Sequence, residues 1–90
     1  SVVRDNPARA RYELELEGGM AFVTYSRAPG VITLLHAEVP PALEGRGHGS
    51  ALVRGVFDQV RAAGDKLIPL CPFIATYLRR HPEFEDLRAR

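Results

Sequence analysis

Three of the five residues from 45 to 49 are glycines, and they separate two segments of opposite character. The segment before them, residues 31–39, is almost continuously apolar and ends at Pro40-Pro41, which lack the N–H donor of a β ladder. After them, apolar residues recur on one helical stripe, which predicts a helix from about residue 49 to residue 63. The stripe consists of Leu52, Val53, Val56, Phe57 and Val60. A chain with this order places its most flexible backbone between a strand and a helix.

Two further β segments precede residue 31. Residues 11–17 alternate between apolar and charged side chains, which is typical of a half-buried strand. Gly18-Gly19 supplies the positive φ angles of a tight hairpin turn, and residues 20–27 continue as a β-rich segment. We therefore expect an antiparallel pair. Residues 31–39 should follow as a central strand covered on both faces, because their apolar run is nearly continuous.

The segment after the helix completes a crossover unit. Gly64 is placed to cap the C-terminus of the helix, and residues 66–70 form a short strand with Pro69 at an irregular or edge position. A strand, a helix and a strand in succession must pair in parallel. A second helix begins at Pro72 and ends before His81-Pro82. Its buried side carries Phe73, Ile74, Tyr77 and Leu78. The expected fold is α/β, a mixed sheet in the order βββαβα.

Length and composition limit the classes of function. Ninety residues suffice for one domain, residues 1–90, with a core from about residue 10 to residue 87 and short polar tails. Twelve basic and eleven acidic residues leave a net charge of +1, so the strong basic field of a nucleic-acid-binding protein is missing. No apolar run approaches the roughly 18 residues of a membrane span, and Cys71 has no second Cys or His at a metal-ligand spacing. We expect a cytoplasmic domain that binds neither nucleic acid, membrane nor metal, and whose sheet edges allow a homodimer.

The glycine-rich loop has two interpretations. A helix N-terminus carries backbone N–H groups without intrahelical partners, so glycines there let a phosphate group approach the backbone closely. The alternative is that the loop is only a flexible turn. The Lys-Ser/Thr pair of a P-loop is absent from the sequence, and Gly-x-Gly is not extended to the Gly-x-Gly-x-x-Gly of a dinucleotide-binding fold, so neither nucleotide motif applies.

Two motifs in this chain resemble the GCN5-related (GNAT) N-acetyltransferases. Residues 44–49, EGRGHG, are similar to the family's Q/R-x-x-G-x-G/A motif between a central strand and a helix, with Gly47 and Gly49 in the glycine positions. Glu44 departs from the usual Gln or Arg. The stretches HAEVPPALEGRGHGSALV and LCPFIATYLRRHPEF together look like a small single-domain subfamily of this length. The resemblance extends over nearly the whole chain.

The resemblance implies a shortened acetyltransferase fold, without the helices that usually follow the first strand and without the last strands of larger members. It implies acetyl-CoA as cofactor, in a cleft where the parallel strands 31–39 and 66–70 splay apart, with the pyrophosphate on the N–H groups of residues 45–50. Arg46 either adds a charge contact or is an exposed, solvated arginine. The implied cofactor-binding residues are Val39, Glu44, Gly45, Arg46, Gly47, His48, Gly49 and Ser50.

Acetyl transfer from a thioester to an amine requires a base for the amine proton, a donor to the carbonyl oxygen and an acid for the thiolate. In the family a backbone N–H at the end of the central strand commonly serves the carbonyl, and Val39 is the matching position. His36 and Glu38 point to the same face of the strand, and either is a candidate base, directly or through a water. The alternatives are a half-buried structural histidine and a solvated carboxylate. Titration in the neutral range favours His36.

Two residues near the second helix are further catalytic candidates. Tyr77 falls where larger family members often carry a tyrosine acid, although its position also fits the apolar side of the helix. Cys71 stands at the junction of strand and helix, where helix N–H groups can activate a thiolate nucleophile. For Cys71 the alternatives are a covalent acetyl-cysteine route and an inert packing residue. Direct transfer is the commoner mechanism of the family.

Three functions compete. The leading hypothesis is an acetyl-CoA-dependent N-acetyltransferase with an unknown amine acceptor. Because the short chain leaves little material for an acceptor pocket, the alternative is a non-catalytic module that binds CoA or acyl-CoA. A third hypothesis, a protein-interaction domain in which the glycine loop is only a turn, predicts no CoA binding.

Overall fold

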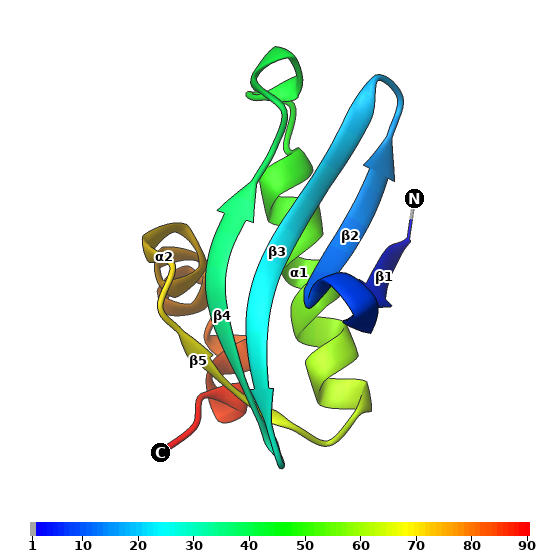
Figure 1. Cartoon of the computed structure of the whole chain (residues 1–90). Coiled ribbons are helices and arrows are strands. Elements are labelled where there is room, and N and C mark those ends of the chain that lie inside the picture. The colour runs from blue at the N-terminus through cyan, green and yellow to red at the C-terminus, as the bar shows by residue number, and fades with distance from the viewer. Residues whose placement is uncertain (1) are drawn as a thin grey trace.

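The computed structural model describes residues 2–90, and within them five strands form one sheet in the order β1-β2-β3-β4-β5 (Figure 1). The strands are β1 (Val3–Asn6), β2 (Arg11–Leu16), β3 (Gly19–Ala28), β4 (Val31–Glu38) and β5 (Lys66–Pro69). Neighbours are antiparallel from β1 to β4, and β5 is parallel to β4. The helices are α1 (His48–Ala62) between β4 and β5 and α2 (Pro72–Arg80) after β5, with 3-10 turns at Pro7–Arg9, Pro41–Leu43 and Pro82–Leu87. The predicted α/β class with a mixed sheet is confirmed.

Strand β1 is an addition to the elements expected from the sequence. Its four residues, VRDN, contain a single apolar side chain, so they carry no alternating pattern. The strand is held by residues far away in the sequence. Gln59 of α1 donates to the Val3 carbonyl at 2.8 Å, and the Tyr25 hydroxyl of β3 donates to the Asp5 carboxylate at 2.6 Å. Residues 3–9 are therefore part of the fold, not a polar tail.

The C-terminal segment also belongs to the core. Phe84 and Leu87 are buried, and the ring of Phe84 lies edge-on to that of Phe57 in α1, with centroids 5.2 Å apart. The Ala89 N–H donates to the Leu67 carbonyl of β5 at 2.8 Å. The chain end thus covers the outer edge of β5, which would otherwise be an open sheet edge.

Both helices lie on one face of the sheet, here called the inner face. Phe57 of α1 packs edge-on against Tyr77 of α2, with ring centroids 5.7 Å apart, so the helices share one core. The sheet contributes Val3, Tyr12, Leu14, Ala21, Val23, Tyr25, Ile32, Leu34 and Leu67 to this core. On the other, outer face, Leu35 and Ile68 are exposed. The expectation that β4 is covered on both faces is therefore wrong, because α1 and α2 share the inner face and leave the outer side of β4 to solvent. No helix within residues 2–90 is long and apolar enough to cross a membrane.

A β-bulge in β4 decides which of its side chains face the helices. Tyr25 of β3 is opposite Leu34, and the preceding residue, Thr24, is opposite His36, so Leu35 is an extra residue. Leu34 is fully buried, Leu35 and His36 are both exposed, and Ala37 packs against the core again. The bulge therefore sends two consecutive side chains to the outer face and returns the end of the strand to the inner one.

Gly55 allows β1 to lie against α1. An ideal Cβ at residue 55 would lie 2.3 Å from Cγ2 and 2.8 Å from Cβ of Val3, which is closer than any ordinary contact. We predict that Gly55→Ala lowers the free energy of unfolding, although alanine is favoured over glycine in a helix by about 1 kcal/mol. In a Val3→Gly background the same substitution should stabilise by up to about 1 kcal/mol, because the collision is gone. Urea unfolding of the double-mutant cycle measures both values. Equal effects in the two backgrounds would contradict the prediction.

Candidate functional site

Strands β4 and β5 part at Leu34. The Leu34 carbonyl accepts the N–H groups of Leu70 and Cys71, at 3.0 Å and 3.3 Å, and the register of the two strands ends there. Beyond this point β4 continues to Glu38, whereas the segment after β5 turns away and begins α2 at Pro72. The fork between the two strands therefore opens towards the C-terminal end of β4.

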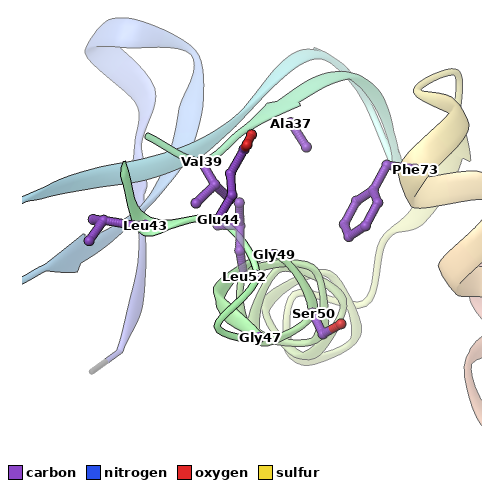
Figure 2. A pocket seen from close by; sticks show the side chains of 10 residues that line it. Ala37, Val39, Leu43, Glu44, Gly47, Gly49, Ser50, Leu52 and Phe73 are labelled. Carbon is purple, nitrogen blue, oxygen red and sulfur yellow. The ribbon is translucent and has the colours of Figure 1, made fainter. Parts of the chain in front are cut away.

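A cleft of about 430 Å³ lies at this fork (Figure 2). It is bounded by the inner side of β4, by the glycine-rich loop with the first turns of α1, and by the start of α2. The lining residues are Ala37, Val39, Leu43, Glu44, Gly45, Gly47, Gly49, Ser50, Leu52 and Phe73. Apolar side chains form much of this wall, and backbone of the glycine loop forms its rim.

The glycines of the loop hold a backbone conformation that other residues adopt with strain. Gly45 and Gly47 both have φ of +80°, and Gly47 is the N-cap of α1. An ideal Cβ at either position would meet nothing within 4 Å, so the requirement is conformational and the backbone beside the cleft is open. The Ala51 N–H donates to the Gly47 carbonyl at 3.1 Å and is the first of the helical ladder. The N–H groups of residues 48–50 precede it and are those that a helix start leaves for an external acceptor.

Gly49 has a different reason to be glycine. Its backbone has no positive φ, but an ideal Cβ there would lie 3.0 Å from Cζ of Phe73. The Phe73 ring leans over the cleft between Ala37 and Gly49, and 48% of the residue is exposed (Figure 2). The expectation that Phe73 lies on the buried side of α2 is therefore wrong. That side consists of Ile74, Tyr77 and Leu78. The sequence does contain an aromatic residue, Phe73, and a glycine at a helix start, Gly49. Such pairs are too common in sequences to predict that these two residues are in contact.

The cofactor-binding residues implied by the resemblance divide into two groups. The first lines the cleft and consists of Val39, Glu44, Gly45, Gly47, Gly49 and Ser50. The second does not line it. Arg46 is an exposed loop residue, and His48 faces a separate groove beside β1, together with Ala51 and Gly55.

His36 and Glu38 come together on the outer face of β4. His36 Nε2 lies 3.3 Å from Glu38 Oε1, and both side chains are more than half exposed. Because they alternate with Ala37 and Val39, which line the cleft from the inner face, they lie on the opposite side of the same strand. The structure therefore brings the two candidate bases together with each other, but not into the cleft.

Tyr77 is buried one helical turn below Phe73, and its hydroxyl is held by α1. The hydroxyl accepts a hydrogen bond from Arg54 Nε at 3.2 Å, and Arg54 Nη2 also contacts Glu83 Oε2 at 3.2 Å. Arg54 is one turn after Ser50, so the Arg54–Tyr77 pair lies one turn below the cleft residues Ser50 and Phe73. The Tyr77 hydroxyl raises the pKa of Arg54. The pKa of the Glu83 carboxyl is lowered, first by its own backbone N–H and then by Arg54.

Cys71 occupies the N-cap position of α2. It is buried, its side chain forms no capping hydrogen bond, and its carbonyl accepts the Ala75 N–H at 2.9 Å. The backbone of Cys71 lies at the fork, because its N–H donates to the Leu34 carbonyl. Its side chain packs in the core and does not line the cleft.

Comparison with known proteins addresses the family and the fold. A family model described as GCN5-related N-acetyl-transferase matches residues 11–87. Among solved structures, the solution structure of a GCN5-like protein from Staphylococcus aureus, described as a proposed N-acetyltransferase, is similar with a TM-score of 0.72. The similarity covers 97% of this chain and 86% of that chain at 21% sequence identity, so it concerns the fold. A search of curated proteins gave no match.

The hydroxyl of Tyr77 can be removed without loss of the core. Arg54 is half-exposed and keeps Glu83 as a partner, so we predict that Tyr77→Phe costs about 0.5–1.5 kcal/mol of the free energy of unfolding, the net value of one hydrogen bond. Tyr77→Ala, which also removes the ring, should cost about 3–5 kcal/mol. Urea unfolding compares the two variants. An equal loss in both would mean that the hydroxyl, not the ring, holds α2 against α1.

Proposed function

We propose, from the premise that this chain belongs to the GCN5-related N-acetyltransferase family, that it uses acetyl-CoA to acetylate a primary amine. The observation that carries the proposal is the cleft at the fork of β4 and β5, whose rim is the glycine-rich start of α1. A thioester of CoA has two dissimilar parts, an anionic diphosphate and a mostly apolar arm. The cleft offers a matching pair of surfaces: backbone N–H groups at one end and apolar side chains along its wall.

The diphosphate would be held by the backbone N–H groups of residues 48–50, where the positive φ of Gly45 and Gly47 keeps the approach free of side chains. The arm would lie along Ala37 and Val39, under the ring of Phe73. When bound, acetyl-CoA supplies the activated acetyl group as a thioester. Everything else in the reaction falls to residues of this chain.

In the proposed reaction the amine nitrogen attacks the thioester carbonyl carbon, a C–N bond forms and the C–S bond breaks. One proton leaves the amine and one is taken up by the thiolate. The Val39 N–H, at the end of β4, would donate to the carbonyl oxygen while it carries negative charge. His36 or Glu38 would take the amine proton, directly or through a water, from the outer side of the strand. Both residues are exposed, so the proton can pass on to solvent.

Tyr77 would protonate the departing thiolate. Its oxygen already accepts a hydrogen bond from Arg54, so its own O–H remains available to donate. Tyr77 does not line the cleft, so this role requires the sulfur to pass beyond the lining and reach one helical turn below Phe73. The arrangement of Arg54 and Glu83 would keep the hydroxyl on that side of α2.

A second candidate function has one observation in its favour. The side chains of His36, Glu38, Cys71 and Tyr77 all lie outside the lining of the cleft. A module that binds CoA or acyl-CoA without turnover would need the loop and the cleft but none of these four groups. Binding without thiol release in the presence of amines would favour this function.

Calorimetric titration tests the cofactor. We predict saturable binding of acetyl-CoA and CoA that survives removal of the 3′-phosphate, because the diphosphate meets the loop. Gly47→Val should weaken the affinity at least about tenfold, or about 1.4 kcal/mol, since the variant strains the N-cap and covers the N–H groups. Gly64→Val is the matched control: Gly64 also has a positive φ, +75°, but lies beyond the other end of α1. No binding at millimolar ligand would contradict the proposal and favour a protein-interaction domain.

Direct transfer makes a prediction for Cys71. Because its side chain is buried away from the cleft, we predict that Cys71→Ala retains most of the turnover and the affinity for acetyl-CoA. Mass spectrometry of the protein after incubation with acetyl-CoA should find no acetyl group on the peptide that contains Cys71. An acetylated Cys71, together with loss of turnover in the alanine variant, would establish the covalent route instead.

A further inference from the structure

The outer face of β4 and β5 carries an apolar cluster beside the fork, consisting of Leu35, Ile68 and Leu70. Their exposed fractions are 43%, 38% and 61%, so each leaves much of its apolar surface in water. Ile68 is opposite Thr33 in the parallel register, and the Leu70 N–H is bonded to the Leu34 carbonyl. Residues two apart on a strand share a face, so Leu70 follows Ile68 on the outer face and lies beside Leu35.

The Glu38 carboxylate lies at one end of this cluster. The bulge sets His36 next to Leu35 on the outer face, and Glu38 lies two residues further along the strand. Among residues 2–90, Glu38 forms an ion pair with no lysine or arginine, only the 3.3 Å contact with His36. Arg11 of β2, which is opposite Thr24 and so in line with His36, is paired with Glu13 at 2.5 Å. The outer end of β4 therefore offers a carboxylate that no lysine or arginine of the described residues pairs with.

We infer that this surface is the acceptor site, and that the acceptor is a primary amine attached to an apolar group. The inference rests on the function proposed above and deepens it. The ammonium form of the amine would lie by Glu38 and His36, and its apolar group would cover Leu35, Leu70 and Ile68. At about 3.3 Å per strand residue, Glu38 is roughly 10 Å from Leu35, so a short linker spans the two parts.

The position of the cluster fits this role. The strand register ends at Leu34–Pro69, so the outer face meets the cleft at the point where β4 has no strand neighbour on its β5 side. A ligand on Leu35 and Leu70 lies across that opening, with the candidate bases on its polar end. The amine bound on the outer face of β4 and the thioester bound in the cleft on the inner face would then meet at the fork.

A second copy of the chain fits the cluster less well. A stable interface buries roughly 800 Å² on each partner, and three partly exposed side chains at one edge of a polar face supply only a small part of that. The Glu38 carboxylate beside the cluster, whose contact within residues 2–90 is with His36 and not with a lysine or arginine, also favours a cationic ligand, whereas a symmetric dimer would bring two such carboxylates together.

The first experiment measures binding to the cluster without turnover. Methyl resonances of Leu35, Ile68 and Leu70 are followed during titration with phenylbutylamine, in the absence and presence of CoA, which has no acetyl group to transfer. Phenylbutanol, which lacks the charge, and diaminobutane, which lacks the apolar group, are the matched ligands. We expect saturable shifts of these methyls with phenylbutylamine, and affinities at least fivefold weaker for the other two ligands. Equal affinity for diaminobutane, or shifts that depend on protein concentration and not on ligand, would overturn the inference.

The second experiment uses variants. Leu35→Ser and Leu70→Ser should each raise KM for phenylbutylamine about tenfold while KM for diaminobutane and the Kd of acetyl-CoA stay unchanged. Val2→Ser is the control, because Val2 is 70% exposed and lies at the far edge of the sheet. Unchanged KM for phenylbutylamine in both leucine variants would overturn the inference. Failure of the proposed function is a separate result: acetyl-CoA would not bind or no thiol would be released, whether or not the amine shifts the methyls.

Discussion

The Leu34 carbonyl is the last link between β4 and β5, and the rest of the site depends on it. It accepts the N–H groups of both Leu70 and Cys71, so one acceptor closes the ladder and also holds the residue that begins α2. Because β4 runs on to Glu38, its edge on the β5 side has no strand neighbour beyond Leu34, and its inner face becomes a wall of the cleft there. Neither of these two N–H groups is left unpaired where the strands part, since both donate to the same oxygen.

The bulge at Leu35 gives the free end of β4 its two surfaces. Side chains alternate along a strand, so without the extra residue the buried Leu34 would be followed on the inner face by His36 and Glu38. Two ionisable groups would then enter the core, and Ala37 would face water. The bulge reverses this order, which keeps the polar pair solvated and gives the cleft an apolar wall. The chemistry proposed for the outer face depends on this one-residue shift.

Local patterns predicted most of the fold. The apolar stripe placed α1 within one residue of its observed bounds, His48–Ala62, and the glycine spacing located the N-cap loop. The bulge could not be predicted, because Leu34 and Leu35 are alike in sequence and only the tertiary fold decides which is buried. Strand β1 was missed since its partners are distant, and Phe73 was misplaced since apolar residues normally mark the buried side. Of the site, the loop followed from sequence, whereas the placement of the catalytic candidates outside the cleft did not.

The cleft is continuous with the hydrophobic core, which links ligand binding to stability. Leu52 lines the cleft and is also fully buried, while Ala37 and Val39 pack against the core from the side of β4. In a chain this small, the same residues thus belong to the border of the core and to the wall of the cleft. Apolar groups that enter the cleft extend the core, and the half-exposed Phe73 ring gains a second surface to pack against. A ligand that binds the folded chain in this way must also raise its resistance to unfolding, by mass action.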